Sequence, residues 1–266
     1  MRRAVVPGVQ LLLRRFPSKR LGLRHSRRGN RTSGHRLDLP DTQKQLPSDD
    51  IVLTYDQALD RLRRALSQPL PGHSAQRWLE PGAGRRWPAG FNPDDARAAA
   101  GLLLVFPRND RPHIVLTVRT HFLERHSGQV SLPGGAVDAG ETHEEAALRE
   151  AHEEIGLEPA AVSVVGALTP LDIPVSGFRL HPIVAAAGAR PRLSAAAGEV
   201  ARILEVAVED LMTAGRVVRR TVVREGQQFE RPAFVTEGVE VWGATAMVLA
   251  EFLAVLGWRG PRQAPI

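Results

Sequence analysis

Short apolar runs rich in β-branched residues recur from residue 99 onward, and they predict a protein built largely of strands. Glycine, proline and polar residues separate these runs, as they do at the turns between strands. The expected strands are residues 99–106, 113–119, 128–132, 161–168, 180–187, 200–208, 216–225, 227–235 and 239–242.

Three segments show helical spacing instead. Residues 54–66 open with a Thr-Gln capping box and place apolar residues three and four positions apart. Further helices are expected at residues 142–156 and 243–256, whereas residues 69–93 are rich in glycine and proline and are expected to be irregular. Because strands and helices do not alternate regularly, the pattern predicts an α+β fold.

The charge is unevenly distributed along the chain. Residues 1–37 contain 11 of the 35 Arg and Lys residues and no acidic residue. The rest of the chain therefore has 24 basic and 29 acidic residues, a net charge of −5. The net charge of +6 therefore comes from this leader and does not predict that the folded part binds nucleic acid. We expect a linker at residues 38–50, one domain at residues 51–258 and a tail at residues 259–266.

Three interpretations fit the basic leader. It could be an arm that binds RNA or anionic lipid, or an organellar transit peptide. It could also be simply an unstructured tail, or residues upstream of the true start that are not part of the working protein. We favour the unstructured tail, since charge runs are usually solvated. Only two of the 35 basic residues are lysines, which indicates GC-rich coding and a bacterial source, where a transit peptide has no organelle to address.

The composition excludes several classes of protein. The chain has no cysteine, which excludes a disulfide framework and any thiolate site. The longest apolar stretch is interrupted by Glu251, so no membrane span and no membrane partner are expected. The apolar N-terminal stretch is short and runs into Arg14 and Arg15, which is not typical of a secretory signal. We therefore expect a cytoplasmic protein.

The helix expected at residues 142–156 carries the most informative chemistry. Thr142 and Glu145 form a capping box at its start, while Gly156 and Pro159 mark its end. Its apolar stripe consists of residues with helical spacing, namely Ala147, Leu148, Ala151 and Ile155.

Three carboxylates gather on one face of this helix. Glu150, Glu153 and Glu154 recur at positions i, i+3 and i+4, where like charges repel. A divalent cation bound by all three would remove this repulsion, and oxygen ligands suit Mg²⁺ or Mn²⁺. The alternative is an ordinary acidic helix neutralised by Arg149 and solvent. The carboxylates alone do not decide between these two interpretations.

The residues around this helix match the Nudix box, so the sequence resembles a Nudix hydrolase. One soft departure is Ala151, where the pattern prefers a bulkier aliphatic residue. The resemblance implies a Nudix fold, in which a mixed β-sheet is sandwiched between helices. The matching residues are Gly135, Glu141, Arg149, Glu150, Glu153, Glu154, Gly156 and Leu157.

The resemblance also implies roles for these residues. The carbonyl oxygen of Gly135 should join the carboxylates as a metal ligand, and Arg149 should pair with Glu141 to orient the ligand helix. Gly134 and Gly135 form a double-glycine turn, whose missing side chains let a cation or substrate approach the backbone closely. The implied carboxylate ligands are Glu150, Glu153 and Glu154.

The residues before the box resemble the signature of the coenzyme A pyrophosphatase branch. Three positions depart from it: Thr120 stands where the branch has Ser, Leu132 where it has Phe, and Glu124 where it has Arg. The matching residues are Leu116, Thr117, Arg119, Leu123, His126, Gly128, Gln129, Val130, Pro133, Gly134 and Gly135.

The third departure affects substrate recognition. Glu124 reverses a charge near the expected site of an anionic substrate, and Arg125 could take over the missing contact. We expect Arg119 and Arg125 to contact phosphate, the alternative being that both are solvated charges. His126 is expected to be structural or to support a ligand, because a lone histidine seldom proves catalytic.

The resemblance implies hydrolysis of the diphosphate in coenzyme A or its thioesters. The products would be 4′-phosphopantetheine, or its acyl form, and adenosine 3′,5′-bisphosphate, with the metal lowering the pKa of the attacking water. Glu153, Glu154 or the more distant Glu199 could accept the proton of that water.

Two alternatives differ in substrate or in activity. The protein could cleave another nucleoside diphosphate derivative, such as ADP-ribose or a dinucleotide polyphosphate. It could also be a sensor that binds a nucleotide without cutting it. Such sensors tend to lose ligand carboxylates, and here none is missing. The sequence leaves the oligomeric state and the number of metal ions open.

Overall fold

A computed structural model describes residues 52–82, 86–120, 129–213, 216–224 and 226–261. The leader, the linker, Glu124, Arg125 and His126 lie outside the described residues. The helices are α1 (Tyr55–Leu66), α2 (His73–Gln76), α3 (His143–Ile155), α4 (Val208–Met212) and α5 (Ala244–Val255), with short 3₁₀ turns η1 (Arg77–Leu79), η2 (Pro93–Asp95) and η3 (Pro159–Ala161).

The strands fall into two sheets. The larger has the order β3-β2-β1-β7-β5, with β4 paired to β1, β6 to β7 and β8 to β2, and the smaller has the order β11-β10-β9. The strands are β1 (Arg97–Arg108), β2 (Arg111–Arg119), β3 (Val130–Ser131), β4 (Gly134–Ala136), β5 (Ser163–Ala167), β6 (Leu171–Ile173), β7 (Phe178–Ala186), β8 (Val200–Ala207), β9 (Val217–Arg224), β10 (Gln227–Thr236) and β11 (Val239–Trp242).

The larger sheet is mixed, which confirms the expected α+β class. Strand β1 pairs antiparallel with β2 and β4 and parallel with β7. Its residues 100–106 are buried, as expected for a central strand covered on both faces. One position matters for the site: Ala100 lies opposite Gly135 of β4 on one side and opposite His181 of β7 on the other.

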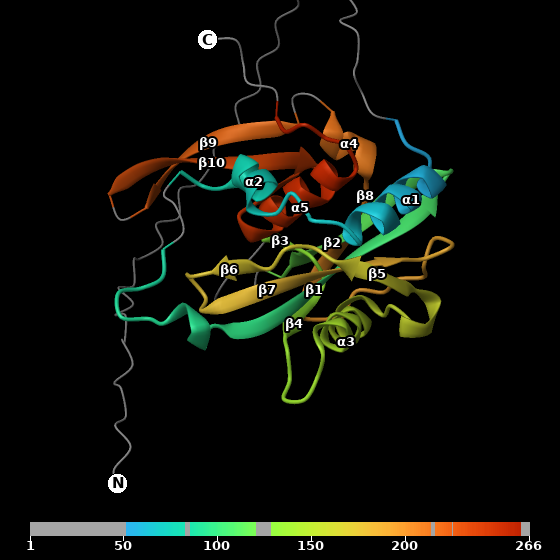
Figure 1. Cartoon of the computed structure of the whole chain (residues 1–266), viewed down its shortest axis with the longest axis horizontal. Coiled ribbons are helices and arrows are strands. Elements are labelled where there is room, and N and C mark those ends of the chain that lie inside the picture. The colour runs from blue at the N-terminus through green and yellow to red at the C-terminus, as the bar shows by residue number, and fades with distance from the viewer. Residues whose placement is uncertain (1–51, 83–85, 121–128, 214–215, 225, 262–266) are drawn as a thin grey trace, which may run out of the picture. The chain divides into compact units, whose positions relative to one another are not determined.

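Helices cover both faces of the larger sheet. Helix α3 packs on one face, α1 and α5 lie on the other, and the smaller sheet lies beyond α5 (Figure 1). Alternate residues of β1 serve the two cores: Leu102 and Leu104 face α3, whereas Leu103 and Val105 face the side of α5. The sheet sandwiched between helices is thus present as expected.

The expectation that residues 69–93 are irregular throughout was wrong in one part. Helix α2 and the turn η1 form there, and Ala75 and Leu79 are buried against the core on the α5 side. Tertiary burial of these two apolar side chains outweighs the local signal of the surrounding glycine and proline residues. Within the described residues, no helix is long and apolar enough to cross a membrane.

Candidate active site at the glycine turn and helix α3

Helix α3 begins and ends as its sequence dictates. The Thr142 hydroxyl accepts a hydrogen bond from the Glu145 backbone N–H, and the Glu145 carboxylate accepts one from the Thr142 N–H, which completes the capping box. Gly156 ends the helix in the left-handed conformation, with φ of 63°. These two ends fix which residues of the helix face the sheet.

Arg149 gathers the acidic groups around the helix. Its guanidinium donates to both carboxylate oxygens of Glu141, at 2.8 and 3.0 Å, and to Glu150 at 2.8 Å. It also donates to the Ala136 carbonyl at 3.1 Å. Hydrogen bonds from Arg149 lower the pKa of Glu141, whose side chain is 15% exposed. The expected pairing of Arg149 with Glu141 is present.

The Glu150 carboxylate lies directly over Gly135. A Cβ atom at position 135 would be 2.5 Å from both carboxylate oxygens, so only glycine leaves them this space. At Gly134, a Cβ would overlap the Ala100 carbonyl and lie 2.6 Å from the Cα of Gly101. The turn expected at the two glycines was wrong, because both lie in strand β4 and pair with β1. They serve two purposes there, the close approach of a carboxylate and the pairing of β4 with β1.

Glu154 is the buried carboxylate of the site, with 5% of its surface exposed. It accepts a hydrogen bond from the Gly134 N–H at 3.3 Å and faces Arg119, whose Nη1 lies 3.7 Å from it. Burial raises its pKa to about 7, and the positive charge of Arg119 opposes that shift. Arg119 is therefore partly exposed to solvent and also lies beside the Glu154 carboxylate.

The loop of residues 194–199, which carries Glu199, is hydrogen-bonded to the C-terminal end of α3. The Ser194 and Ala196 backbone N–H groups donate to the carbonyls of Ile155 and Glu154, both at 2.9 Å. At the other end of the loop, the Thr120 hydroxyl donates to the Gly198 carbonyl at 2.8 Å. The Thr120 backbone N–H donates to the Glu199 carbonyl at 3.1 Å, one residue after Arg119, whose guanidinium faces Glu154.

The donor set fits a hard divalent cation. Glu150 and Glu154 both meet the two glycines of β4, and the carbonyl oxygen of Gly135 belongs to the same strand. Glu153 lies apart: its side chain is 56% exposed and it approaches Arg149 at 3.5 Å. Among the described residues, no group of three acidic or histidine side chains is close enough together in this structure to coordinate one cation.

Several polar residues near this site have no signal in the local sequence. The rings of His143, at the start of α3, and His181, on β7, stack at 3.6 Å between centroids. Burial lowers the pKa of His181, and His143 and Arg179 lower it further. His143 and His181 lie far apart in the sequence. Their contact could be predicted only by someone who already knew that β7 pairs with β1, the strand on which α3 packs.

Comparisons with known proteins agree with this geometry. The family model of the NUDIX domain matches residues 95–224. The chain is 35% identical over 164 residues to the uncharacterised Nudix hydrolase NudL of Citrobacter koseri, covering 61% of this chain and 85% of that protein. It is also 35% identical over 159 residues to NudL of Escherichia coli O7:K1, covering 59% and 82%.

A solved structure is also similar. The Nudix hydrolase RenU of M. smegmatis is 25% identical, with a TM-score of 0.39, over 50% of this chain and 80% of that one. The assignment does not depend on it, because most of the length of the two NudL proteins is matched at 35% identity. The chain belongs to the Nudix hydrolases, enzymes that act on the pyrophosphate bonds of nucleoside diphosphate derivatives.

Proposed function

We propose that this protein is a metal-dependent pyrophosphohydrolase of coenzyme A or its thioesters. It would release 4′-phosphopantetheine, or the acyl form, and adenosine 3′,5′-bisphosphate. The observation that carries the chemistry is the meeting of Glu150 and Glu154 at Gly134 and Gly135 of β4. The observation that favours coenzyme A is the stretch from Leu116 to Gly135, which resembles the signature of that branch.

Glu150, Glu153, Glu154 and the carbonyl of Gly135 would hold Mg²⁺ or Mn²⁺. When bound, the ion neutralises the diphosphate and makes a water molecule more acidic. Arg149 fixes Glu150 and strand β4 through its bonds to Glu150 and to the Ala136 carbonyl, so the ligand oxygens stay in place. This network supports a role for Arg149 in positioning the ligands.

A carboxylate of the cluster would accept the proton of the attacking water. Glu153 and Glu154 belong to the ligand helix, whereas Glu199 stands on the loop whose backbone is hydrogen-bonded to the end of that helix. Arg119, beside Glu154, would contact the phosphates of the substrate. The same contact is proposed for Arg125, on the evidence of its place in the signature.

Glu124 favours a second candidate function. An acidic residue where the coenzyme A branch has arginine suits a substrate without the 3′-phosphate, such as ADP-ribose or a dinucleotide polyphosphate.

Incubation with a panel of substrates and either Mg²⁺ or Mn²⁺, followed by mass identification of the products, tests both candidates. We expect 4′-phosphopantetheine and adenosine 3′,5′-bisphosphate from coenzyme A. Turnover of ADP-ribose alone would reject the first candidate in favour of the second. Glu153→Gln or Glu154→Gln protein with normal metal-dependent turnover would reject the assignment of the site.

A further inference from the structure

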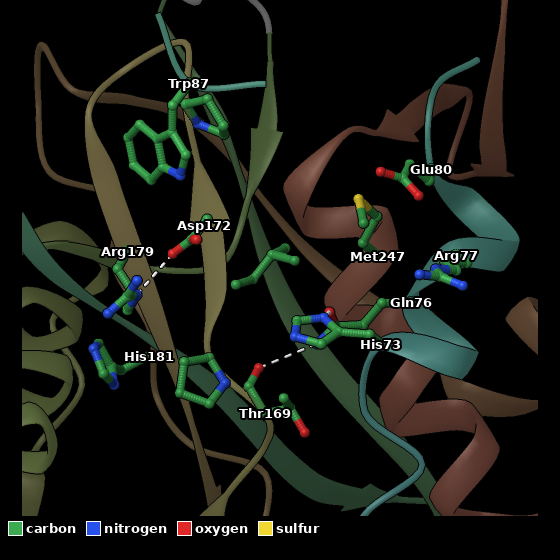
Figure 2. A pocket seen from close by; sticks show the side chains of 13 residues that line it. His73, Gln76, Arg77, Glu80, Trp87, Thr169, Asp172, Arg179, His181 and Met247 are labelled. Atoms are coloured by element: carbon green, nitrogen blue, oxygen red, sulfur yellow. Dashed lines mark hydrogen bonds and ion pairs between the residues drawn. The ribbon is translucent and has the colours of Figure 1, made fainter. Parts of the chain in front are cut away.

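A groove of about 630 Å³ opens between α2–η1 and the β6–β7 hairpin, and we call it the α2–β7 groove (Figure 2). Its volume lies within the range of small-molecule sites. The polar residues that line its two walls are His73, Gln76 and Arg77 on one and Thr169, Arg179 and His181 on the other.

The two walls are fastened together by a buried carboxylate. Glu251 of α5 is fully buried; it accepts hydrogen bonds from the Gln76 amide at 2.8 Å and from the Thr169 hydroxyl at 2.6 Å. Gln76 also donates to the Thr169 carbonyl at 3.1 Å, and its side-chain oxygen lies 2.8 Å from the His73 ring. The groove is therefore formed before a ligand arrives, which lowers the cost of binding.

Positive groups in the groove are available to an anion. Arg77 is exposed and, within the described residues, its guanidinium makes no hydrogen bond or ion pair. Two acids also line the groove: Arg179 neutralises Asp172 at 2.7 Å, and Glu80 is half-buried. Arg77 supplies the positive charge, and His73, four residues earlier on the same short segment, can offer a ring nitrogen to the same phosphate.

An aromatic ring stands at one end of the groove. Trp87 is half-buried and stacks on Phe91 with ring centroids 4.6 Å apart, nearly parallel. Because Phe91 covers one face of the indole and Trp87 lines the groove, the remaining face can stack on a planar base. An arginine and an indole together suit a phosphorylated nucleoside.

The groove lies within reach of Gly134 and Gly135. Gly135 and His181 lie opposite Ala100 on its two sides. Two strand spacings separate Gly135 from His181, about 10 Å between the backbones. Ala100 itself is buried beneath α3, so a nucleoside attached to a diphosphate at the two glycines of β4 would cross β1 at its less buried end, at Ala98 and Ala99.

We propose that the α2–β7 groove binds the 3′-phosphorylated adenosine of the substrate, with adenine on Trp87 and the 3′-phosphate between Arg77 and His73. This proposal rests on the proposed function. The pantetheine arm is an uncharged amide chain and gains little from the Arg77 guanidinium, whereas the 3′-phosphate needs a positive group of its own beyond those at the diphosphate.

Calorimetry on the full chain without added metal tests the groove separately from catalysis. The probes are adenosine 3′,5′-bisphosphate and adenosine 5′-monophosphate. We expect the bisphosphate to bind about tenfold more tightly, the contribution of one charge-assisted contact. Arg77→Ala should abolish this difference, while Arg64→Ala, an exposed arginine on α1, should leave it unchanged. Trp87→Ala should weaken both nucleotides alike.

Equal affinity for the two nucleotides in the unaltered protein would overturn the proposal, and so would an unchanged preference in Arg77→Ala protein. Arg77 is exposed, so its removal should not affect folding, and the result does not depend on whether Trp87→Ala folds. The proposed function is tested by a different experiment. Absence of coenzyme A hydrolysis would reject the proposed function, whereas calorimetry would still measure nucleotide binding in the groove.

Discussion

Glu150 holds its carboxylate in the space that a side chain at residue 135 would occupy. The neighbouring Gly134 meets backbone atoms of β1 instead. The two adjacent glycines are therefore needed for different reasons, one for ligand placement and one for folding, and substitution can separate these reasons.

Gly135→Ala should reduce activity without unfolding the protein. The new methyl group meets the end of a flexible side chain, so Glu150 can move aside at a cost within about 1.5 kcal/mol of stability. Metal-dependent kcat/KM should fall at least about tenfold. Gly134→Ala meets the backbone of Ala100 and Gly101 and should lose more than about 3 kcal/mol. Urea unfolding and activity assays compare the two, and equal stability losses would contradict this account.

Arg149→Lys should lower kcat/KM by about 10- to 100-fold, because a lysine cannot bridge Glu141, Glu150 and the Ala136 carbonyl at once. Arg190 offers a matched control: it makes a similar two-point contact with Glu205, at 2.8 and 2.9 Å, but on the surface. Arg190→Lys should leave activity unchanged and cost less than about 1 kcal/mol. Similar activity in both variants would show that Arg149 has no special role.

Metal binding should stabilise the protein and should depend on the carboxylates of α3. Mn²⁺ at about 100 times its Kd adds about 2.7 kcal/mol to the free energy of unfolding, which corresponds to a rise in Tm of about 5 °C or more. Glu153→Gln and Glu154→Gln should each reduce this rise, whereas Glu144→Gln, an exposed change on the same helix, should keep it. A full rise in both ligand variants would exclude the predicted site.

His181 should make the folded state sensitive to acid. Burial lowers the pKa of His181, and the nearby His143 on α3 and Arg179 on β7 lower it further. Arg179 itself is paired with Asp172 on β6. The unfolded chain therefore binds the proton more readily, so the stability contribution is complete above pH 6.5 and is lost as the pH falls below it.

Replacement of His181 tests this dependence. His181→Gln should weaken the fall in Tm between pH 7 and pH 5 relative to the unaltered protein, because glutamine does not titrate. His113→Gln, on β2 and away from the groove, is the control and should retain the original dependence. An identical pH dependence in all three proteins would contradict the assignment to His181.

Local signals predicted those parts of the fold that depend on neighbouring residues. The capping boxes at Thr54 and Thr142 and the stop at Gly156 are confirmed, because the interactions that set helix ends span only a few residues. Helix α5 is confirmed within a residue or two at each end, from its apolar spacing and its start after Gly243. The box likewise predicted the contact of Arg149 with Glu141.

Long-range contacts escaped prediction for an equally physical reason. The parallel pairing of β1 with β7 joins segments about eighty residues apart, and no local pattern specifies it. The groove depends on that pairing and on Glu251, which looked in the sequence only like an interruption of an apolar helix. Strand β6 is too short to show a period of its own.

The attachment of residues 194–199 to α3 has a consequence for how this site can vary. Main-chain groups make the contacts with Ile155 and Glu154, and the Gly198 carbonyl receives the hydroxyl of Thr120. Substitutions of the side chains along this loop therefore leave its backbone hydrogen bonds to α3 in place. Sequence changes along residues 194–199 can therefore alter the surface beside α3 while the backbone that carries Glu199 stays attached to the helix.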